Sequence, residues 1–428
     1  MIKKIIRFLF ILLFFTAIPF CTSNEKEFTV WIGGAPQEID FWQKLVDEYN
    51  EKTGDNVILV RQPTYTDQRL QSLVVSLEAE QKNPDLFLMD VVWVDQFIKS
   101  GWLEPLDKYF DKKDFSTRNF FGSVIHSIDE YNGKFYAFPV FMDIGLLYSR
   151  MDLLKKYGYD GPPKTWDDFA AEAERIQKGE RISNKNFYGY VWQGAQYEGL
   201  VCTFLEFISS HGGSIMKNGR INLNTPENIH ALTFMHDLLY KYKISPPNTY
   251  TEMKEEEVRR SFQNGNALFE RNWTYAWNLA QSKNSPVKGK IVISPLPHKE
   301  GFYSTSALGG WHIGMSKYSD VKNKAWNFIK HVTSFDVQKK LLLGVGWNPG
   351  RKDIYQDSVL LSQIPRLKIL YEVFKSAVAR PKIPYYTQVS EVIQRYVNNC
   401  LADKISPENA LAGMQKEIDR IADIYEKK

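Results

Sequence analysis

The sequence predicts an α/β protein of two lobes that are joined by more than one crossing of the chain. Its 428 residues are too many for a single hydrophobic core, and chains of this length usually divide into about two domains. Strand and helix patterns alternate over the first hundred residues, which is typical of a mostly parallel sheet flanked by helices. Two strand patterns that contain proline, residues 136–141 and 290–297, have the character of segments that pass between two bodies. Several crossings indicate a hinge between the lobes.

The first lobe is expected to begin with three strands, in residues 28–32, 57–60 and 85–90. Helix patterns with regularly spaced apolar residues lie between them. The third strand is apolar throughout its centre, as in a strand that is buried on both faces. Ligands of such sheets bind beyond the carboxyl ends of the strands, where the loop GGAPQEID and Asp90 both fall.

The stretch KFYAFPVFMDIGLLYSR, residues 134–150, is the expected passage into the second lobe. Its Asp143 is a carboxylate within an apolar run, and a charge in such a place needs partners. A role in capping a turn or in a buried ion pair explains Asp143 about as well as contact with a ligand in a cleft.

The second lobe is expected to open with a helix that Thr165 caps, with Asp168 three residues later. The remaining patterns are a strand at 187–192, helices at 200–209 and 229–240, a strand in NALFERN, a return through 290–297, a strand at 307–315, and helices at 325–333 and through most of the chain after 345. The last helix carries the apolar stripe Leu411, Met414, Ile418, Ile421 and Tyr425, which is too short for a coiled coil and indicates core packing.

The expected domain division follows from these crossings. Residues 28–140 with 290–340 form the first lobe, and residues 141–289 with 341–428 form the second.

The N-terminus has the pattern of an export signal that ends at Cys21. Basic residues precede an apolar run that is too short to span a bilayer comfortably, and the polar tether 22–27 follows. This pattern resembles a bacterial lipoprotein signal, in which the cysteine is lipidated, although Phe20 stands where a small residue is usual. Ordinary cleavage nearby and an uncleaved anchor are the alternatives. All three predict a protein outside the cytoplasm, in the periplasm or at the cell surface.

Charge and cysteine content exclude several classes of protein. Without Lys3, Lys4 and Arg7 of the leader, 51 basic side chains face 50 acidic ones, so nothing indicates a nucleic-acid partner. The two cysteines after Cys21 are too few for a disulfide framework. Cys202 lies in an apolar helical run and is expected to be a small buried side chain.

Catalytic motifs are absent from the sequence. It contains no GxSxG, HExxH, phosphate-binding loop or CxxC, and no GxGxxG after a strand. The acidic run at residues 255–257 is expected to be a solvated helix face. We therefore expect no enzyme, no cofactor and no metal site.

Three loops instead combine aromatic side chains with isolated charges or paired glycines, namely RNWTYAW, ALGGWHIG and ARPKIPYY. A sugar ring packs its C–H faces on aromatic planes, and its hydroxyls bond to carboxylates and guanidinium groups. One such cluster is more often core than site, but three of them favour a sugar-binding site.

A set of motifs spans the chain from about residue 28 to its end, including GGAPQEIDFW, FLMDVVWVDQF, YAFPVFMDIGLLYSR, ALFERNWTYAW, LGGWHIG, GWNPGR and ARPKIPYY. In these motifs the chain resembles the substrate-binding lipoproteins of carbohydrate ABC importers, within family 1 of the extracellular solute-binding proteins, and is similar to the trehalose/maltose-binding group. The resemblance implies a type II periplasmic-binding-protein-like fold whose two lobes close around the sugar by hinge motion. It also implies a monomer that captures an α-linked disaccharide, such as trehalose, maltose or sucrose, and delivers it to membrane permease subunits.

The same resemblance implies the binding residues. Polar contacts fall on Glu38, Arg69, Asp90, Asp143, Gly310 and Arg380, and stacking contacts fall on Trp273, Tyr275 and Trp311. The chain departs from the pattern at Phe141, where an aromatic residue with a hydroxyl is expected. The departure removes one hydrogen bond, which is worth about 0.5 to 1.5 kcal/mol.

Two other classes of function are considered. A secreted glycoside hydrolase would use two of Glu38, Asp90 and Asp143, with their carboxyl groups about 5 to 9.5 Å apart. A binder of peptides or oligoanions would need more Lys and Arg in the cleft loops than the sequence contains.

Overall fold

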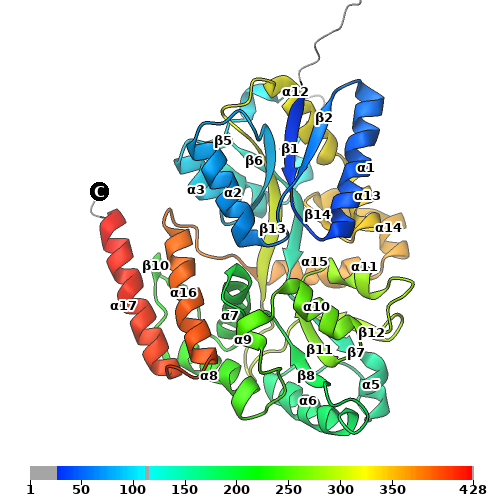
Figure 1. Ribbon diagram of the computed structural model, residues 1–428, viewed down its shortest axis with the longest axis vertical. Coiled ribbons are helices and arrows are strands. Elements are labelled where there is room, and N and C mark those ends of the chain that lie inside the picture. Colours follow the sequence, from blue (N-terminus) through cyan, green and yellow to red (C-terminus); the bar gives the residue numbers. More distant parts are fainter. Residues whose placement is uncertain (1–26, 111–114, 427–428) are drawn as a thin grey trace, which may run out of the picture.

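Two sheets, one in each lobe, carry the fold (Figure 1). The computed structural model describes residues 27–110 and 115–426, and Cys21 with the predicted leader lies outside this part. Within the described residues, no helix combines the length and the apolar composition that crossing a bilayer requires.

The larger sheet belongs to the first lobe and has the strand order β14-β6-β13-β3-β1-β2, with β15 paired to β13. Its strands are β1 (Phe28–Ile32), β2 (Val57–Arg61), β3 (Leu86–Asp90), β6 (Ala137–Ile144), β13 (Ser306–Met315), β14 (Asn348–Pro349) and β15 (Ala377–Val378). The helices around it are α1 (Pro36–Thr53), α2 (Thr66–Glu78), α3 (Val94–Lys99), α12 (Lys322–Val332) and α13 (Phe335–Gly344). The first three strands are parallel, as their alternation with helices predicts, and β13 runs antiparallel between β3 and β6.

The smaller sheet belongs to the second lobe and has the order β12-β7-β11-β8. Its strands are β7 (Leu146–Arg150), β8 (Tyr188–Val191), β11 (Ala267–Asn272) and β12 (Ile291–Ser294). The helices of this lobe are α5 (Met151–Lys156), α6 (Trp166–Glu180), α7 (Glu198–Ser210), α8 (Pro226–Tyr240), α9 (Thr249–Glu252), α10 (Glu255–Gln263) and α11 (Ala276–Ala280). Thr165 caps α6 as predicted, because its side chain accepts a hydrogen bond from the backbone N–H of Asp168.

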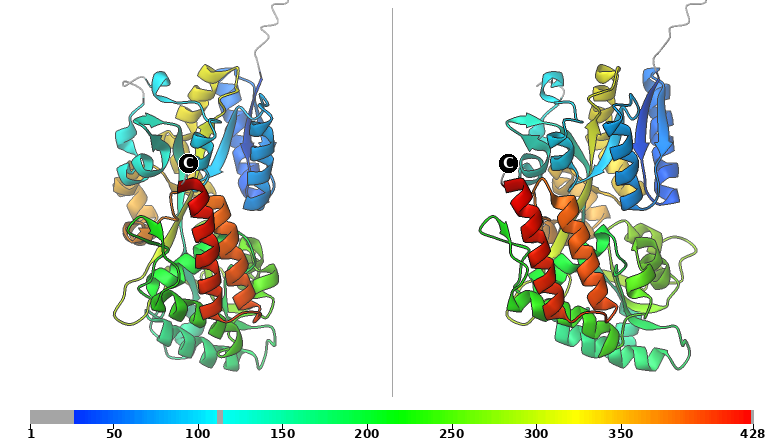
Figure 2. Two further views of the ribbon diagram at one scale, coloured as in Figure 1. Left: turned by 90° about the vertical axis from the view of Figure 1, so that its left-hand side faces the viewer. Right: turned by 60° about the vertical axis from the view of Figure 1, so that its left-hand side comes forward.

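The C-terminal part of the chain adds four helices, which are α14 (Ser358–Gln363), α15 (Arg366–Lys375), α16 (Tyr386–Leu401) and α17 (Pro407–Glu426). The short elements of the described part are α4 (Gly122–Val124), β4 (Glu130–Tyr131), β5 (Lys134–Phe135), β9 (Met216–Lys217), β10 (Arg220–Ile221), and the short helical turns η1 (Asp107–Tyr109), η2 (Thr117–Asn119), η3 (Ile125–Asp129) and η4 (Lys352–Gln356). Figure 2 shows α16 and α17 as an antiparallel pair along one side of the second lobe. The predicted stripe of α17 is buried at Leu411, Met414 and Ile418, whereas Tyr425 is 41% exposed.

The strand that enters the second lobe differs in detail from its prediction. Residues 136–141 were expected to break at Pro139 and to lie at an edge or a crossing. β6 instead continues through Pro139, paired there with β13, and β14 pairs with β6 only at Phe141 and Met142. β6 leads directly into β7 of the smaller sheet, so the segment does lie at a crossing. Pro139 lies opposite His312, where the register between β6 and β13 shifts. This irregularity is a place where a residue without an N–H donor can enter the sheet.

The return crossing also lies later than predicted. Residues 290–297 were expected to enter the first lobe, but β12 pairs with β7 in the smaller sheet. The passage therefore lies between β12 and β13. Strands β14 and β15, from the segment assigned to the second lobe, pair with the larger sheet. The domain division stays a prediction. These pairings place β12 with the second lobe and β14 and β15 with the sheet of the first lobe, which differs from the division near residues 290 and 340.

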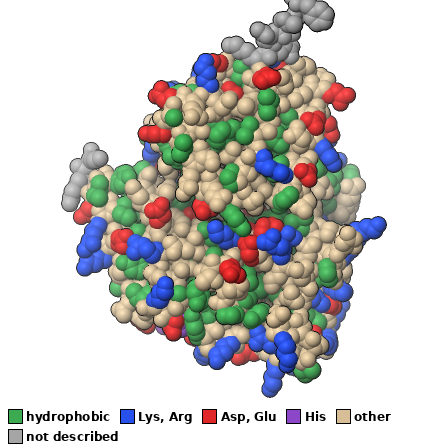
Figure 3. All heavy atoms as spheres, viewed as in Figure 1, with side chains coloured by type: hydrophobic (Ala, Val, Ile, Leu, Met, Phe, Trp, Pro, Cys, Tyr) green, Lys and Arg blue, Asp and Glu red, His purple; other side chains and the backbone are tan. Residues whose placement is uncertain are grey.

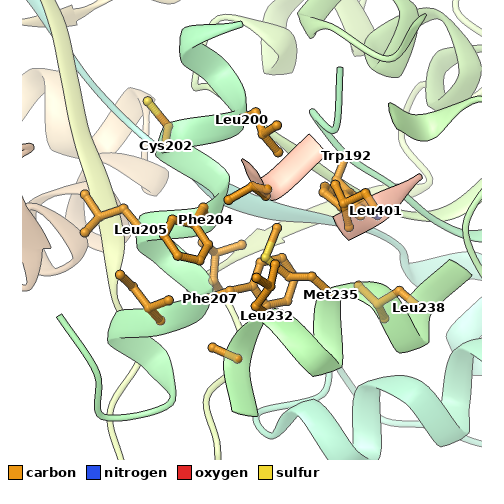
Figure 4. Close-up of a cluster of buried hydrophobic side chains, with 14 of the residues drawn as sticks. Trp192, Leu200, Cys202, Phe204, Leu205, Phe207, Leu232, Met235, Leu238 and Leu401 are labelled. Atoms are coloured by element: carbon orange, nitrogen blue, oxygen red, sulfur yellow. The ribbon is translucent and has the colours of Figure 1, made fainter. Parts of the chain in front are cut away.

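Helix α7 forms the centre of the core of the second lobe, as the apolar run 200–209 predicts. Figure 4 shows its Leu200, Phe204 and Phe207 pointing toward Leu232 and Met235 of α8. Cys202 on the same helix is 2% exposed, so the prediction of a buried side chain is confirmed.

The smaller sheet buries one acidic side chain whose titration should affect stability. Glu270 on β11 is 1% exposed and accepts a hydrogen bond from Asn272 Nδ2 at 2.6 Å. Burial raises the pKa of Glu270 to about 8, so the folded protein holds a proton that the unfolded chain releases at lower pH. Glu270 therefore costs stability as the pH rises from about 4.5 to 8.

We predict that Glu270→Gln flattens this pH dependence. The free energy of unfolding of the variant, relative to the wild type, should rise by roughly 3 kcal/mol between pH 5 and pH 8. Urea unfolding at a series of pH values measures this difference. Glu51→Gln, on an exposed part of α1, is the control and should track the wild type. Parallel profiles for the wild type and Glu270→Gln would contradict the prediction.

Candidate functional site

A cleft between the lobes is lined by all nine residues that the resemblance implies and by Phe141, where the chain departs from the pattern. It encloses about 880 Å³ of space that atoms do not fill, including its opening to solvent. Figure 3 shows acidic, basic and hydrophobic side chains gathered at mid-height on the face in view, between the lobes. The ten residues are Glu38, Arg69, Asp90, Phe141, Asp143, Trp273, Tyr275, Gly310, Trp311 and Arg380.

The larger sheet brings several of these residues together through its register. Asp90 ends β3 and pairs with Trp311 of β13, and Trp311 pairs in turn with Phe141 of β6. Phe141 and Asp143 are two residues apart on one strand, so both face the same side of the sheet. Glu38 lies in the first turn of α1, just beyond the end of β1.

Asp143 connects the entering strand to the loop after β11. Its Oδ1 accepts hydrogen bonds from the backbone N–H of Thr274 at 2.9 Å, from Thr274 Oγ1 at 2.7 Å and from the N–H of Ile144 at 3.0 Å. Burial raises the pKa of Asp143 to about 6, and these hydrogen bonds oppose the rise. Asp143 orders the loop of Trp273 and Tyr275, as the turn-capping interpretation predicts, and it also lines the cleft, where its contact with a ligand stays a prediction.

The paired glycines of ALGGWHIG let the backbone approach other groups closely. A Cβ atom at Gly309 would lie 3.0 Å from the Trp273 ring. Gly310 has φ of +145°, and a Cβ atom there would lie 2.7 Å from the carbonyl oxygen of Phe141. Side chains at either position would therefore push against the wall of the cleft.

The aromatic side chains of Trp311, Trp273 and Tyr275 each contact a charged side chain. The Arg69 guanidinium lies 4.5 Å from the centre of the Trp311 ring, and Arg271 lies 4.0 Å from that of Trp273. Tyr275 donates its hydroxyl hydrogen to Glu256 Oε1 at 2.8 Å. These contacts restrict ring motion before any ligand arrives.

Glu38 and Arg69 lie on the first-lobe side of the cleft. Glu38 Oε2 accepts from the backbone N–H of Ala35 at 2.7 Å, and Oε1 accepts from the indole N–H of Trp347. Burial raises the pKa of Glu38 to about 7. The two hydrogen bonds and the positive charge of Arg69 act in the opposite direction and limit the rise. Arg69 itself donates to the carbonyl oxygens of Pro63 and Thr64.

Arg380 joins the two lobes across the cleft. Its Nη2 lies 2.9 Å from Asp90 Oδ1 in the first lobe, and its Nη1 lies 2.7 Å from Glu198 Oε1 at the start of α7 in the second. The guanidinium group is almost fully buried. The two carboxylates depend on it for charge compensation.

Several residues that line the cleft were missed by the sequence analysis, namely Glu198, Cys202, Glu255, Glu256 and Trp347. The prediction of a solvated face at residues 255–257 was wrong for Glu255 and Glu256. Glu255 lies three residues before Val258 and seven before Phe262, which are the buried residues of α10. This helical spacing was the signal that placed Glu255 on the inner face.

The cleft offers hydrogen-bonding side chains and ring faces. Among the residues that the structure describes, no three His, Cys, Asp or Glu side chains are grouped so that they could hold a metal ion.

Comparison with known proteins gives a consistent result. The model of a family described as bacterial extracellular solute-binding proteins matches residues 35–339. A probable ABC transporter-binding protein of Deinococcus radiodurans is 37% identical over 90% of this chain and 91% of its own length. Two similar solved structures each cover 92% of this chain and 99% of their own. Maltose-bound MalE3 of T. maritima has a TM-score of 0.87 at 38% identity. A Thermotoga lettingae ABC transporter solute-binding protein with bound α-D-tagatose has a TM-score of 0.84 at 29% identity.

We predict that Arg380→Ala lowers the free energy of unfolding by about 3 kcal/mol, because it leaves Asp90 and Glu198 buried without their cation. The surface pair of Arg395 and Glu417 provides a matched control, since its side chains are 45% and 35% exposed. Arg395→Ala should lower the free energy of unfolding by less than about 1 kcal/mol. Urea titration of both variants measures the difference, and equal losses would contradict the assignment.

Proposed function

Because this chain belongs to the bacterial extracellular solute-binding protein family, we propose that it is the receptor of an ABC importer that captures an α-linked disaccharide. Trehalose, maltose and sucrose are the candidate ligands, and a membrane permease is the recipient. The type II periplasmic-binding-protein-like fold is confirmed by its similarity to the two solved structures. The family consists of binding proteins, and its description places them outside the cell.

The observation that carries the proposal is the arrangement of Trp273, Trp311 and Asp143 around one cleft. Two indole rings provide planes for the C–H faces of sugar rings, and the carboxylates that line the same cleft can accept from neighbouring hydroxyls. The similar structures support a carbohydrate ligand, since one holds maltose and the other a ketohexose.

Hinge closure couples capture to delivery. The chain passes between the lobes at β6 to β7, again between β12 and β13, and in the segment before α16 (Figure 1). Residues from both sides of these passages line the cleft, so a sugar that bonds to both lobes stabilises the closed form. A permease would then recognise the matched surfaces of the two closed lobes.

The carboxylates that a glycoside hydrolase would use have structural partners here. Asp90 is paired with Arg380, Asp143 accepts three hydrogen bonds, and Glu38 accepts two. These contacts favour binding over hydrolysis, and incubation with chromogenic glycosides tests the choice.

We predict that calorimetric titration of the purified protein with maltose, trehalose and sucrose gives saturable heat with at least one sugar. Trp273→Ala should weaken that binding by about 100-fold or more, because it removes a stacking plane. Trp277→Ala is the control in the same RNWTYAW motif, since Trp277 does not line the cleft and packs under Arg366. Absence of heat with every sugar at millimolar concentration would contradict the proposal, as would a large loss of melting temperature in Trp273→Ala alone.

We also propose that Cys21 carries a lipid that anchors the receptor, as a monomer, to the membrane. The wild type should then fractionate with membranes, and mass spectrometry should find the lipid on Cys21. Cys21→Ser should prevent lipidation at this position. An unmodified Cys21 in the membrane-bound protein would contradict this assignment.

A further inference from the structure

We propose that Trp347 is a positioning residue of the sugar site, which orients the Glu38 carboxylate and forms a wall of the cleft beside Phe141. This inference rests on the proposed function, and it assigns a role to a residue of the GWNPGR segment. Trp347 lies directly before β14, is 3% exposed and lines the cleft.

The first part of the role is orientation of Glu38. The indole N–H of Trp347 donates to Oε1, and the backbone N–H of Ala35 donates to Oε2 at 2.7 Å. One donor on each oxygen fixes the plane of the carboxylate. An ionised carboxylate has about four acceptor positions, so both oxygens can still accept from a ligand hydroxyl.

The second part of the role is the wall itself. The rings of Trp347 and Phe141 have their centres 3.9 Å apart, and Trp42 supports Trp347 from 6.0 Å. Phe141 has no hydroxyl, and the polar atom of Trp347 is bonded to Glu38. This wall therefore presents hydrocarbon to the ligand and leaves hydrogen bonding on this side to Glu38.

The contact between Trp347 and Glu38 should be visible in the titration of Glu38. Arg69 of α2 and Glu256 of α10 also act on Glu38, the first favouring its ionised form and the second opposing it. Burial raises the pKa of Glu38 to about 7, and the indole N–H limits the rise. Removal of this donor should therefore raise the pKa further, since hydrogen bonds to a charged form favour that form.

The test is Trp347→Phe, which removes the donor and keeps an aromatic ring. The Glu38 carboxyl carbon is followed by ¹³C NMR against pH without any sugar, and its titration midpoint should move up by about one pH unit. The maltose affinity should fall about threefold at pH 7.5, because the ionised fraction of Glu38 falls by that factor, and it should recover at higher pH. Glu38→Gln, as a second variant, should remove the pH dependence near pH 7 from both backgrounds.

Trp42→Phe is the matched control. Trp42 packs in the same aromatic cluster, does not line the cleft, and its indole nitrogen makes no hydrogen bond within the described part of the chain. This variant should leave the Glu38 midpoint and the pH profile of maltose affinity unchanged.

Three outcomes would overturn the inference. The Glu38 midpoint could stay in place in Trp347→Phe, the pH profile of maltose affinity could stay unchanged while the midpoint moves, or affinity could fall equally at every pH together with the melting temperature. The last outcome would indicate packing alone. A wild type that binds no sugar would count against the proposed function, and the ligand-free titration would still decide whether Trp347 controls Glu38.

Discussion

A buried ion pair between Glu206 and Arg271 is the contact on which the geometry of the cleft depends. Arg271 Nε and Nη2 lie 2.8 and 2.5 Å from the two carboxylate oxygens, and both residues are fully buried. Glu206 also accepts from the backbone N–H of Ala307 at 3.1 Å, near the start of β13. A Cβ atom at Gly145 would lie 1.9 Å from Glu206 Oε1, so the entering strand passes directly over the pair. Two of the three passages between the lobes, β6 to β7 and β12 to β13, are thereby fixed to one point.

The same ion pair places the stacking surface. The guanidinium of Arg271 also lies against the ring of Trp273, and Asp143 holds the loop that follows β11 through Thr274. The position of the indole plane therefore depends on the strands that cross between the lobes. A buried pair is weak evidence for stability, because desolvation opposes its attraction. Its role here is to set geometry, since it connects α7, β11 and the start of β13.

Patterns within one element were predictable from the sequence, and contacts between distant segments were not. The alternation of strands and helices predicted the sheet of the first lobe, and Thr165 predicted the start of α6. Trp311 was singled out as an aromatic residue beside paired glycines, Trp273 was singled out in an aromatic cluster beside an isolated charge, and the remaining positions came from the resemblance. Glu198 and Trp347 were missed because their partners, Arg380 and Glu38, lie 182 and 309 residues away. The pairing of β12 with β7 was missed because proline marks a crossing and an edge strand equally well.

The distribution of the cleft residues explains why closure should depend on the ligand. Glu38, Arg69, Asp90 and Trp311 belong to the first lobe, and Trp273, Tyr275 and Glu255 belong to the second. Burial raises the pKa of both Glu38 and Glu255, so the proposed closure without a ligand would leave two carboxylates in a place where the charged form is disfavoured. A polyhydroxyl ligand can replace water there with hydrogen bonds to both lobes at once, whereas an apolar molecule of the same size cannot. Under the proposed hinge mechanism, a ligand of this kind would shift the equilibrium toward the closed form, because a ligand shifts an equilibrium only by its difference in affinity for the two states.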